Sequence, residues 1–457
     1  MRSLWLDEAL TGATDAPALA GGERADVCVV GGGYTGLWAA LRLKELEPSL
    51  DVALVEADVC GGGPSGRNGG MALSWWSKFR ALEALCGSEE ALRLARASAD
   101  AVAAIGAFCS EHGIDAHYRP DGWLWSATSD AWVGAWSPTI ERLETLGERP
   151  FRELDGAETE LLAGSRRQLA AVFEQTAAIV QPALLARGLR RVALERGVRV
   201  FERSPVVALE REGVRTARGR VRATRVLLAL GSWAIQLRPL RQALVVVSSD
   251  IVATPPIPDR LDEIGWRDGV SVSDARPRTE YYRPTRDGRV VFGKGGGTLA
   301  FGGRIGGRFH GPARHAAEVE AAFRRVYPGL ADVPVAAAWT GPIDRSRTGL
   351  PFFGRLRDGV VYGSGYSGRG LAQSYLGGRI LASLVLGRDD EWSGCGLVGV
   401  PPGRFPPEPL RYAGGLVLRS AVVATERAED ERRRPPRLAA AAVRLAPAGL
   451  LPRNRSR

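Results

Sequence analysis

Three glycines near the start of the chain, Gly31, Gly33 and Gly36, have the Gly-x-Gly-x-x-Gly spacing that is typical of a dinucleotide-binding turn. In such a turn the first glycine allows a tight bend, the second lets a pyrophosphate approach the backbone, and the third lets a helix pack closely on a strand. Glu56 follows about twenty residues later, where an acid accepts hydrogen bonds from a ribose diol. An acid there would repel a 2′-phosphate, so the motif indicates NAD or FAD rather than NADP.

A second glycine-rich segment covers residues 61–70 and contains Ser65, Arg67 and Asn68. By composition alone it could be a flexible loop exposed to solvent. It follows the second predicted strand, however, and ligands of open α/β sheets bind at the carboxyl ends of the strands. We therefore expect its polar side chains to donate hydrogen bonds to an anion or to a flavin ring.

The elements that must position these motifs follow from the apolar periodicity. Residues 25–30 and 51–56 predict strands, and residues 37–46 predict the helix between them. Strand, glycine turn, helix and strand in this order open a doubly wound parallel sheet. The other predicted elements are a helix over 182–196, strands over 198–202, 225–230 and 360–362, a hairpin over 206–221, a glycine loop over 363–370 and helices over 371–386 and 410–427.

Composition indicates an ordinary soluble globular protein, because 45% of the 457 residues are hydrophobic and 25% are charged. No stretch approaches the roughly 18 consecutive apolar residues of a membrane span. Asp7 and Glu8 stand where a signal peptide would be apolar, so we expect a cytoplasmic protein. The five cysteines are far apart, without a Cys-x-x-Cys pair or a nearby histidine cluster, and predict neither a disulfide framework nor a metal site.

The net charge of +10 is concentrated at the C-terminal end, where residues 431–457 contain eight arginines and one acid. The remaining residues are nearly neutral. A basic patch, rather than a basic tail, is the usual footprint of a nucleic-acid-binding protein, so no nucleic-acid partner is expected. We expect this tail to be a solvated end of the chain.

Taken together, three segments resemble the D-amino-acid-oxidase family of FAD-dependent oxidoreductases, in the branch that contains glycine, sarcosine and γ-glutamylputrescine oxidases. They are residues 29–36, Val55-Glu56, and Ser65-Gly-Arg-Asn-Gly-Gly70. Residues 225–233 are similar to the family's strand and Gly-x-Trp near the pyrophosphate, and residues 349–354 to its late Gly-x-Pro-x-x-Gly element. The resemblance covers about residues 25–395 and implies FAD as the cofactor. The glycine loop lacks the histidine to which some relatives attach FAD, so we expect noncovalent binding.

Residues 363–371 are similar to the family's C-terminal flavin segment, in which a helix N-terminus points at the pyrimidine edge of the flavin. Backbone amides at a positive helix end would stabilise the negative charge of a reduced flavin. A glycine turn without a ligand is the alternative. The cofactor-binding residues that the resemblance implies are Gly31, Gly33, Tyr34, Thr35, Gly36, Glu56, Ser65, Arg67, Asn68, Gly69, Gly70, Val206, Ala229, Gly231, Trp233, Gly363, Gly368, Arg369, Gly370 and Leu371.

The expected fold class is therefore α/β, with a doubly wound Rossmann-type FAD-binding domain and an inserted, mainly antiparallel α+β substrate domain. Residues 243–303 are rich in predicted strands with Pro and Gly turns, which favours the antiparallel insertion. The predicted organisation is a lead-in (1–24), an FAD-binding domain in three parts (25–90, 176–235 and 341–395), a substrate domain in two parts (91–175 and 236–340) and a Pro/Arg-rich C-terminal extension (396–457).

The resemblance implies oxidation of a carbon–nitrogen bond, with hydride transfer to flavin N5 and hydrolysis of the resulting imine. This chemistry needs a neutral amine whose C–H lies about 3–3.5 Å from N5, in a dry pocket. The catalytic candidates are Tyr282, Arg283, Asp344 and Tyr366. The open alternatives are that Tyr281 and Tyr282 pack the sheet, that Arg283 caps a strand edge, and that Asp344 pairs with Arg345 or Arg347 on the surface.

The family's amino-acid oxidases commonly place an Arg-Pro pair for the substrate carboxylate where this chain has residues 339–344, Trp-Thr-Gly-Pro-Ile-Asp. We therefore expect a small-molecule amine or N-substituted amine rather than a free α-amino acid. The electron acceptor is left open between molecular oxygen and an electron carrier, as in an amino-acid or imino-acid dehydrogenase. A rival of another class is a flavin-stabilised binding protein with a basic tail.

Overall fold

The predicted glycine turn joins a buried strand directly to a helix. In the computed structural model, which describes residues 2–266, 269–399, 401 and 403–446, β2 (Val27–Val30) ends at Gly31, and α2 begins at Tyr34. Gly31 has a φ of +108°, a conformation that favours glycine. A Cβ atom at Gly36 would lie 1.9 Å from the carbonyl oxygen of Gly31, so only glycine lets the helix start this close to the strand.

The six-stranded sheet that contains β2 has the order β19-β20-β13-β2-β3-β9, with all neighbours parallel except β19 and β20. Along β2, Val27 and Val29 face one apolar core and Cys28 and Val30 face another, as expected for a parallel strand buried on both sides. The strands are β2 (Val27–Val30), β3 (Val52–Val55), β9 (Arg199–Phe201), β13 (Arg225–Leu228), β19 (Phe352–Arg357) and β20 (Val360–Ser364).

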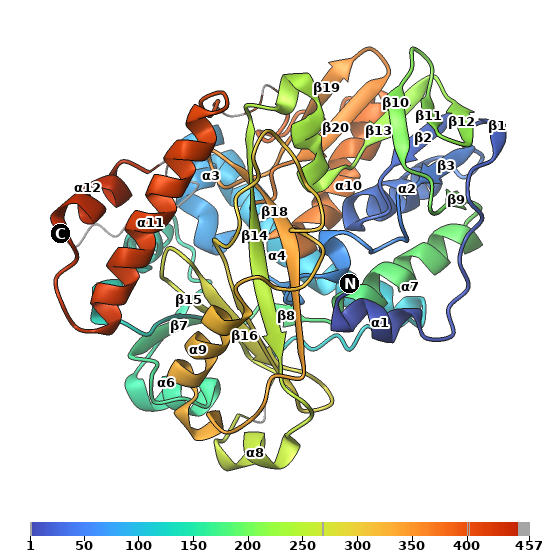
Figure 1. Ribbon diagram of the computed structural model, residues 1–457. Helices are drawn as coiled ribbons and strands as arrows, with labels where there is room; N and C mark the ends of the chain where they lie inside the picture. Colours follow the sequence, from blue (N-terminus) through green and yellow to red (C-terminus); the bar gives the residue numbers. More distant parts are fainter. Residues whose placement is uncertain (1, 267–268, 400, 402, 447–457) are drawn as a thin grey trace.

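The two faces of this sheet are covered by different layers (Figure 1). Helices α2, α7 and α10 pack on one face, and a four-stranded sheet of order β1-β12-β11-β10 lies toward the other. The predicted hairpin over residues 206–221 is part of that smaller sheet. Its strands are β1 (Gly21–Arg24), β10 (Val206–Leu209), β11 (Val214–Thr216) and β12 (Gly219–Arg222).

The second large layer is an eight-stranded sheet of order β18-β14-β17-β16-β15-β5-β7-β6, mostly antiparallel, with β15 and β5 parallel. Its longest pair, β14 and β18, extends from the Leu244–Ser346 pair to the Ala253–Ala337 pair. The strands are β5 (Trp123–Ala127), β6 (Arg152–Leu154), β7 (Ala170–Glu174), β14 (Leu244–Ala253), β15 (Ser271–Asp274), β16 (Glu280–Pro284), β17 (Val290–Lys294) and β18 (Ala337–Ser346); a separate two-stranded sheet pairs β4 (Met71–Ala72) with β8 (Ala178–Ile179).

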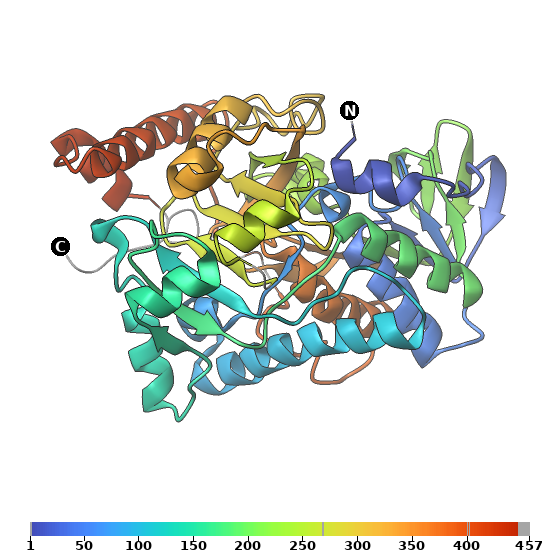
Figure 2. The same ribbon diagram turned by 90° about the horizontal axis from the view of Figure 1, so that it is seen from below.

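Helices surround these sheets, and the long α4 runs along one side of the molecule beside α10 (Figure 2). None of the helices in the described ranges is long and apolar enough to cross a membrane. The α-helices are α1 (Leu4–Leu10), α2 (Tyr34–Leu46), α3 (Phe79–Cys86), α4 (Ser88–Glu111), α5 (Ser137–Thr145), α6 (Gly156–Ala163), α7 (Pro182–Glu195), α8 (Pro258–Glu263), α9 (Ala316–Val326), α10 (Gly370–Leu386), α11 (Leu410–Asp430) and α12 (Arg437–Arg444).

This architecture confirms the predicted fold class, a parallel α/β sheet with a mainly antiparallel second sheet. The strands of the parallel sheet come from three separate parts of the chain, and those of the eight-stranded sheet lie between these parts. The exact domain boundaries stay predictions.

The C-terminal extension does more than continue the chain, because α11 docks on the eight-stranded sheet through three carboxylates, of which Glu426 is buried. Glu426 accepts a hydrogen bond from the Arg278 amide at 2.9 Å and lies 3.7 Å from the Lys294 amine. Asp430 accepts from the guanidinium of Arg276 at 2.6 Å, and Glu429 from the Trp132 indole at 3.0 Å. The helix thus supplies negative charge to cations that the sheet buries.

The first testable prediction concerns this contact. Replacing Glu426 by alanine (E426A) leaves the Arg278 amide without its acceptor and removes a nearby counter-charge of the Lys294 amine. We expect the free energy of unfolding to fall by about 1–3 kcal/mol, seen as a lower thermal midpoint. E431A, at an exposed acid just beyond α11, is the matched control and should leave the midpoint unchanged. Equal midpoints for both variants would show that the contact contributes nothing.

Candidate functional site

A cavity of about 1170 Å³ lies between the six-stranded and eight-stranded sheets. Its wall includes the glycine turn after β2, the loop 61–70, β10, the segment after β13, part of β18 and residues 366–371. Pockets for small molecules commonly measure about 300–1,000 Å³. This cavity is larger than that range, in keeping with a ligand as large as a dinucleotide.

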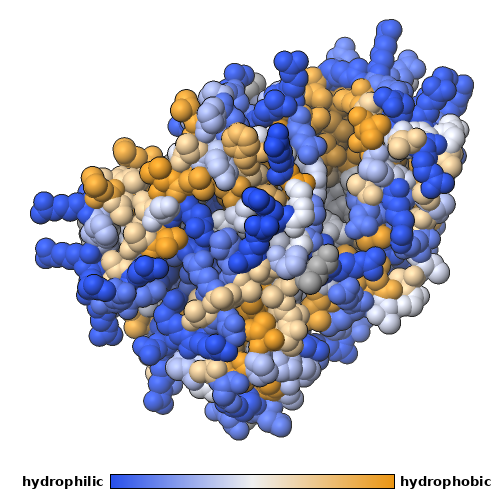
Figure 3. Space-filling view, in the orientation of Figure 1, coloured by the Kyte–Doolittle hydropathy of each residue, from blue (hydrophilic) through white to orange (hydrophobic). Residues whose placement is uncertain are grey.

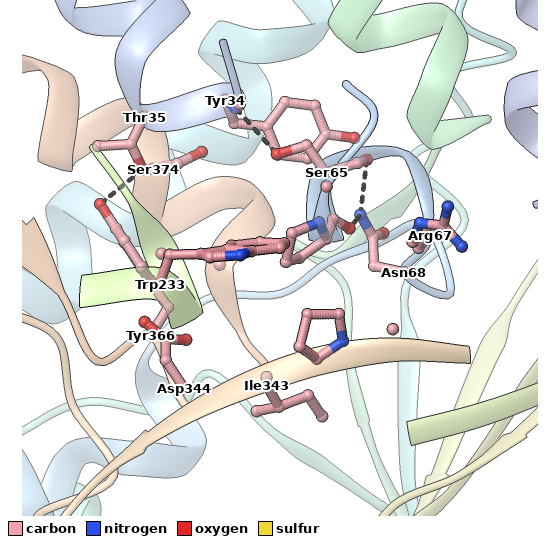
Figure 4. A pocket seen from close by; sticks show the side chains of 18 of the residues that line it. Tyr34, Thr35, Ser65, Arg67, Asn68, Trp233, Ile343, Asp344, Tyr366 and Ser374 are labelled. Carbon is pink, nitrogen blue, oxygen red and sulfur yellow. Dashed lines mark hydrogen bonds between the residues drawn. The ribbon is translucent and has the colours of Figure 1, made fainter. Parts of the chain in front are cut away.

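The N-terminus of α2 opens into this cavity. Gly33 precedes the helix and has no side chain with which to cap it, and the Tyr34 amide donates to Ser65 Oγ at 2.9 Å. Figure 4 shows Tyr34, Ser65 and Asn68 together on one side of the cavity. A Cβ at Gly33 would lie 2.9 Å from Ser65 Oγ, so glycine keeps this approach to the helix open. Amide groups at a positive helix end suit a pyrophosphate.

Glu56 lies beside this turn, at the end of β3. Its carboxylate accepts from the Gly32 amide at 2.6 Å and from the Asp58 amide at 2.9 Å. Burial raises the pKa of Glu56, and the two amides oppose that rise. The carboxylate is therefore held in a fixed orientation in the cavity wall, as an acceptor for ribose hydroxyls requires.

The loop 61–70 holds its shape through side chains that satisfy its carbonyl groups. Asn68 donates to the carbonyls of Pro64 and Ser65 and accepts from the Gly70 amide at 2.7 Å. Arg67 donates to the Gly62 carbonyl at 3.0 Å, and burial lowers its pKa. Arg67 and Asn68 line the cavity, whereas Gly70 lies just behind the wall.

Arg283 lies behind the same loop rather than in the cavity wall. Its guanidinium donates to the Gly69 carbonyl at 2.6 Å and to the Val180 carbonyl at 2.7 Å, and it lies over the Trp5 ring. Burial lowers its pKa to about 9. Arg283 therefore positions the loop from outside the cavity wall, and its bonds to the carbonyls of Val180 and Pro284 agree with the alternative that it caps strand ends.

Within the late segment 363–371, residues 366–371 line the cavity. Gly368, with a φ of +88°, lets the chain turn so that Arg369, Gly370 and Leu371 line the cavity at the start of α10. Tyr366 lies in the wall, and its hydroxyl accepts from Thr35 Oγ1 at 2.9 Å (Figure 4). This bond ties the late segment to the first turn of α2. Gly363 lies within β20, where a Cβ would meet the Phe353 ring at 2.7 Å.

Asp344 is buried in the cavity wall instead of forming a surface ion pair. It accepts from the Gly365 amide at 2.6 Å and from Ser364 Oγ at 3.1 Å. Burial raises its pKa, and these donors act against the rise. The carboxylate therefore fixes the turn that leads into the late segment.

Tyr282 is placed in the core, which corrects its assignment to the pocket. Along β16 the side chains alternate, so Tyr281 faces the cavity and Tyr282 faces the opposite side of the sheet. The Tyr282 ring stacks on Phe292 with centroids 4.8 Å apart, and its hydroxyl accepts from Gln168. Sheet packing, the alternative for this residue, is what the structure shows.

Most of the expected cofactor-binding residues meet in this one cavity, whereas Gly36, Gly70, Gly363, Tyr282 and Arg283 lie outside its wall. Trp233 lies across the cavity in Figure 4, and its ring stacks on His310 at 5.6 Å. The expected residues in the wall are Gly31, Gly33, Tyr34, Thr35, Glu56, Ser65, Arg67, Asn68, Gly69, Val206, Ala229, Gly231, Trp233, Asp344, Tyr366, Gly368, Arg369, Gly370 and Leu371. Their contacts with a cofactor stay predictions.

The wall residues that the sequence did not indicate include Lys78, Trp125, His310 and Arg345. Lys78, Trp125 and His310 lie outside every motif, and no local pattern marks them. Arg345 could have been found from strand alternation, because it points to the same side of β18 as Ile343, two residues earlier. Among the described residues, no cluster of three or more histidine, cysteine or acidic side chains could hold a metal ion.

Comparisons with known proteins agree with this geometry. The model of the DAO family, FAD dependent oxidoreductases, matches residues 26–384. The chain is 30% identical over 368 residues to gamma-glutamylputrescine oxidoreductase of Escherichia coli, with 79% of this chain and 84% of that protein covered. It is also 30% identical over 382 residues to glycine oxidase of Pseudomonas aeruginosa, covering 79% and 95%. The protein belongs to this family of FAD-dependent oxidoreductases, and its cofactor is FAD.

Solved structures show the same fold. Glycine oxidase from Geobacillus kaustophilus has a TM-score of 0.63 at 21% identity, with 80% of this chain and 96% of that chain covered. L-proline dehydrogenase from P. horikoshii has a TM-score of 0.65 at 19% identity, covering 80% and 95%. The three glycines fit an FAD-binding turn: a Cβ at Gly31 or Gly36 would clash with backbone carbonyl oxygens and prevent the tight turn and the close helix, and a Cβ at Gly33 would crowd the open helix N-terminus beside Ser65.

The second testable prediction concerns Glu56. Replacing it by alanine (E56A) removes the charged acceptor beside the glycine turn, and a hydrogen bond to a charged group contributes about 1.5–3 kcal/mol. We expect the dissociation constant for FAD to rise about 10- to 100-fold. It is measured by titrating apoprotein with FAD and following flavin fluorescence. E47A, at an exposed acid just beyond α2, is the control. Equal affinities would contradict the role of Glu56.

Proposed function

We propose that this protein oxidises a carbon–nitrogen bond of an amine or N-substituted amino compound, and that the resulting imine is then hydrolysed. The observation that carries the proposal is that the cavity wall extends past the expected FAD-binding residues to side chains of or beside the eight-stranded sheet, and we call this part of the cavity the substrate chamber. Met71, Leu73, Trp125 and Tyr281 line this chamber. The names of the relatives, a gamma-glutamylputrescine oxidoreductase and glycine oxidases, support a substrate that contains nitrogen.

The chain's own groups meet the needs of this reaction. Bound FAD supplies the acceptor for two electrons and a proton equivalent as hydride. The amides of residues 368–371, at the positive end of α10, would stabilise negative charge at the edge of the cofactor that they face. The aromatic and aliphatic wall of the chamber excludes water from the reacting C–H bond. Asp344 holds the turn before residues 366–371 through the Gly365 amide, and Tyr366 ties these residues to Thr35 in α2.

A dehydrogenase that passes electrons to a carrier instead of oxygen is the alternative within this proposal. The two differ in how the reduced protein is reoxidised. A binding protein that uses FAD only for stability is the rival of another class, and its flavin would not be reduced by any amine.

The third testable prediction is reduction of the flavin by substrate. The purified protein is mixed anaerobically with polyamines, γ-glutamyl amines, N-methyl amino acids and D-amino acids, and the flavin absorption band is followed. We expect one class to bleach the band, because hydride transfer reduces the flavin and the reduced form lacks the absorption band of the oxidised form. Recovery in air with peroxide formation indicates an oxidase, and recovery only with an added carrier indicates a dehydrogenase. A flavin that no amine bleaches would overturn the proposal.

The fourth prediction contrasts two tyrosines. Tyr366→Phe removes the hydroxyl that joins the late segment to Thr35, and we expect kcat/KM to fall about tenfold, the effect of losing one hydrogen bond that aligns the site. Tyr282→Phe removes a bond to Gln168 in the core. We expect this control to lower the thermal midpoint and leave kcat/KM unchanged. The reverse pattern would show that the cavity wall is misassigned.

A further inference from the structure

The last described helix, α12, carries two leucines on its outer side. Leu438 and the residue at the helix end, Leu445, are each 86% exposed, the highest values among the large hydrophobic side chains of the described residues. They lie seven positions apart, close to two helical turns, so they project in nearly the same direction. Ala439 and Ala446 are buried and form the inner side of the helix. The helix thus packs inward through alanines and presents leucines to the outside.

The neighbouring helix α11 extends this outer surface. Leu410 and Val417, also seven positions apart, are 65% and 64% exposed. α12 packs beside α11, and hydrophobic side chains gather over both helices on one face of the molecule (Figure 3). Exposed hydrophobic side chains that gather in this way mark an interaction site, whereas isolated ones do not. We call Leu410, Val417, Leu438 and Leu445 the apolar patch.

Arginines accompany the apolar patch. Arg437 and Arg444 are exposed, and each directly precedes one of the two leucines of α12. Residues 431–446 contain five arginines and one acid, Glu431, which pairs with Arg433. Among the described residues, no carboxylate oxygen lies within the 4.0 Å of an ion pair from Arg437 or Arg444. The patch is therefore bordered by positive charge that the protein itself does not neutralise.

The acids of α11 do not offset this charge, because they face the eight-stranded sheet. Glu426, Glu429 and Asp430 are all the acids of the helix, and each accepts a hydrogen bond from a residue of that sheet or beside it. The outer surface of α11 and α12 thus combines exposed apolar side chains with arginines and turns its carboxylates inward.

We propose that α11 and α12 dock this protein on the surface of a membrane that contains anionic lipids. The apolar patch would enter the boundary between headgroups and acyl chains, while the arginines pair with lipid phosphates. An interfacial helix enters only about 5–10 Å, so no helix has to cross the bilayer. This surface is separate from the FAD cavity, because none of the four residues of the patch lines that cavity. The inference therefore does not depend on the proposed function.

The pairing of apolar and positive groups favours a membrane over other occupants. Nucleic acid would use the arginines, but its charged backbone offers no apolar layer to the leucines. A second copy of the chain would cover the leucines but would bring Arg437 and Arg444 close to arginines of like charge. An anionic bilayer offers an apolar layer beneath a negative surface, and stable anchoring to a bilayer takes two such signals.

The fifth prediction is binding to anionic vesicles. The FAD-loaded protein is mixed with vesicles of phosphatidylcholine and phosphatidylglycerol in equal parts, or of phosphatidylcholine alone, and the bound fraction is separated by flotation and read from flavin absorption. We expect binding to the anionic vesicles to be at least tenfold tighter. Added salt should weaken it, because salt screens the attraction of the arginines. Equal binding to both vesicles, or binding to neither, would overturn the proposal.

A variant with both Leu438→Ser and Leu445→Ser tests the apolar part of the surface. Because both side chains are exposed, we expect flavin content and thermal midpoint to stay unchanged, and vesicle binding to weaken at least tenfold. Leu194→Ser is the control, at an exposed leucine of α7, which lies far from α12 in Figure 1. It should bind like the unaltered protein. Undiminished binding of the double variant would overturn the proposal, since charge alone would then hold the protein.

A variant with both Arg437→Gln and Arg444→Gln tests the charged part. Each arginine near an anionic surface strengthens binding several-fold, so we expect a loss of at least tenfold. Arg211→Gln with Arg218→Gln is the matched control, because it removes the same charge from two exposed positions with the same spacing, in the loops of the smaller sheet. It should bind normally. An equal loss in both double variants would show that net charge, rather than this surface, governs binding and would overturn the proposal.

Two further measurements address the other occupants. Sedimentation of the unaltered protein and of the leucine variant, without lipid, reports self-association, and titration with a DNA duplex reports nucleic-acid binding. We expect equal sedimentation of the two proteins and weaker binding to the duplex than to anionic vesicles. A dimer that the leucine variant abolishes would assign the apolar patch to a second copy. Tighter binding to the duplex, unchanged in the leucine variant, would assign the arginines to nucleic acid. Either result would overturn the membrane assignment.

Discussion

The site depends on satisfying the backbone of the loop 61–70, which has little regular structure and is held between the two large sheets. A buried carbonyl group without a donor costs free energy comparable to a lost hydrogen bond. Ser3 Oγ donates to the Gly66 carbonyl at 2.5 Å, and the indoles of Trp5 and Trp339 donate to the carbonyls of Asn68 and Arg67 at 3.0 and 2.9 Å. With Arg283 on the Gly69 carbonyl, side chains from α1, β16 and β18 thus hold one loop.

This bracing links the two sheets mechanically. Because Trp339 and Arg283 belong to the eight-stranded sheet and the loop follows β3 of the parallel sheet, a shift of one sheet relative to the other would break several of these bonds together. The bond between Thr35 and Tyr366 adds a second tie, between the beginning and the end of the parallel domain. The cavity wall is therefore built on fixed elements. On the outer surface, by contrast, hydrophobic side chains gather over α11 and α12 (Figure 3).

The sequence predicted those parts of the structure whose signals are local. The glycines at 31, 33 and 36, the alternation of strands and helices and the late glycine segment each have a pattern within a few residues, and the structure has the corresponding elements. The helix α1 in the N-terminal lead-in was not predicted: it buries Trp5 and supports the loop through contacts with residues more than sixty positions away. Lys78, His310 and the buried face of Tyr282 are likewise set by tertiary packing and strand direction, which no short pattern records. The helix predicted over residues 410–427 is present, but its sequence does not indicate the partners of Glu426 and Asp430.

The docking of α11 has a consequence for how the protein is made. During synthesis β2 emerges early, but Val226 of β13 joins Cys28 of β2 to Val360 of β20, so the parallel sheet waits for strands that emerge much later. The acids of α11 emerge later still, and until then Arg276, Arg278 and Lys294 lack part of their counter-charge. Long-range pairing of this kind slows folding and leaves incomplete surfaces exposed. Neither large sheet therefore has its full set of partners until residues 410–430 have emerged.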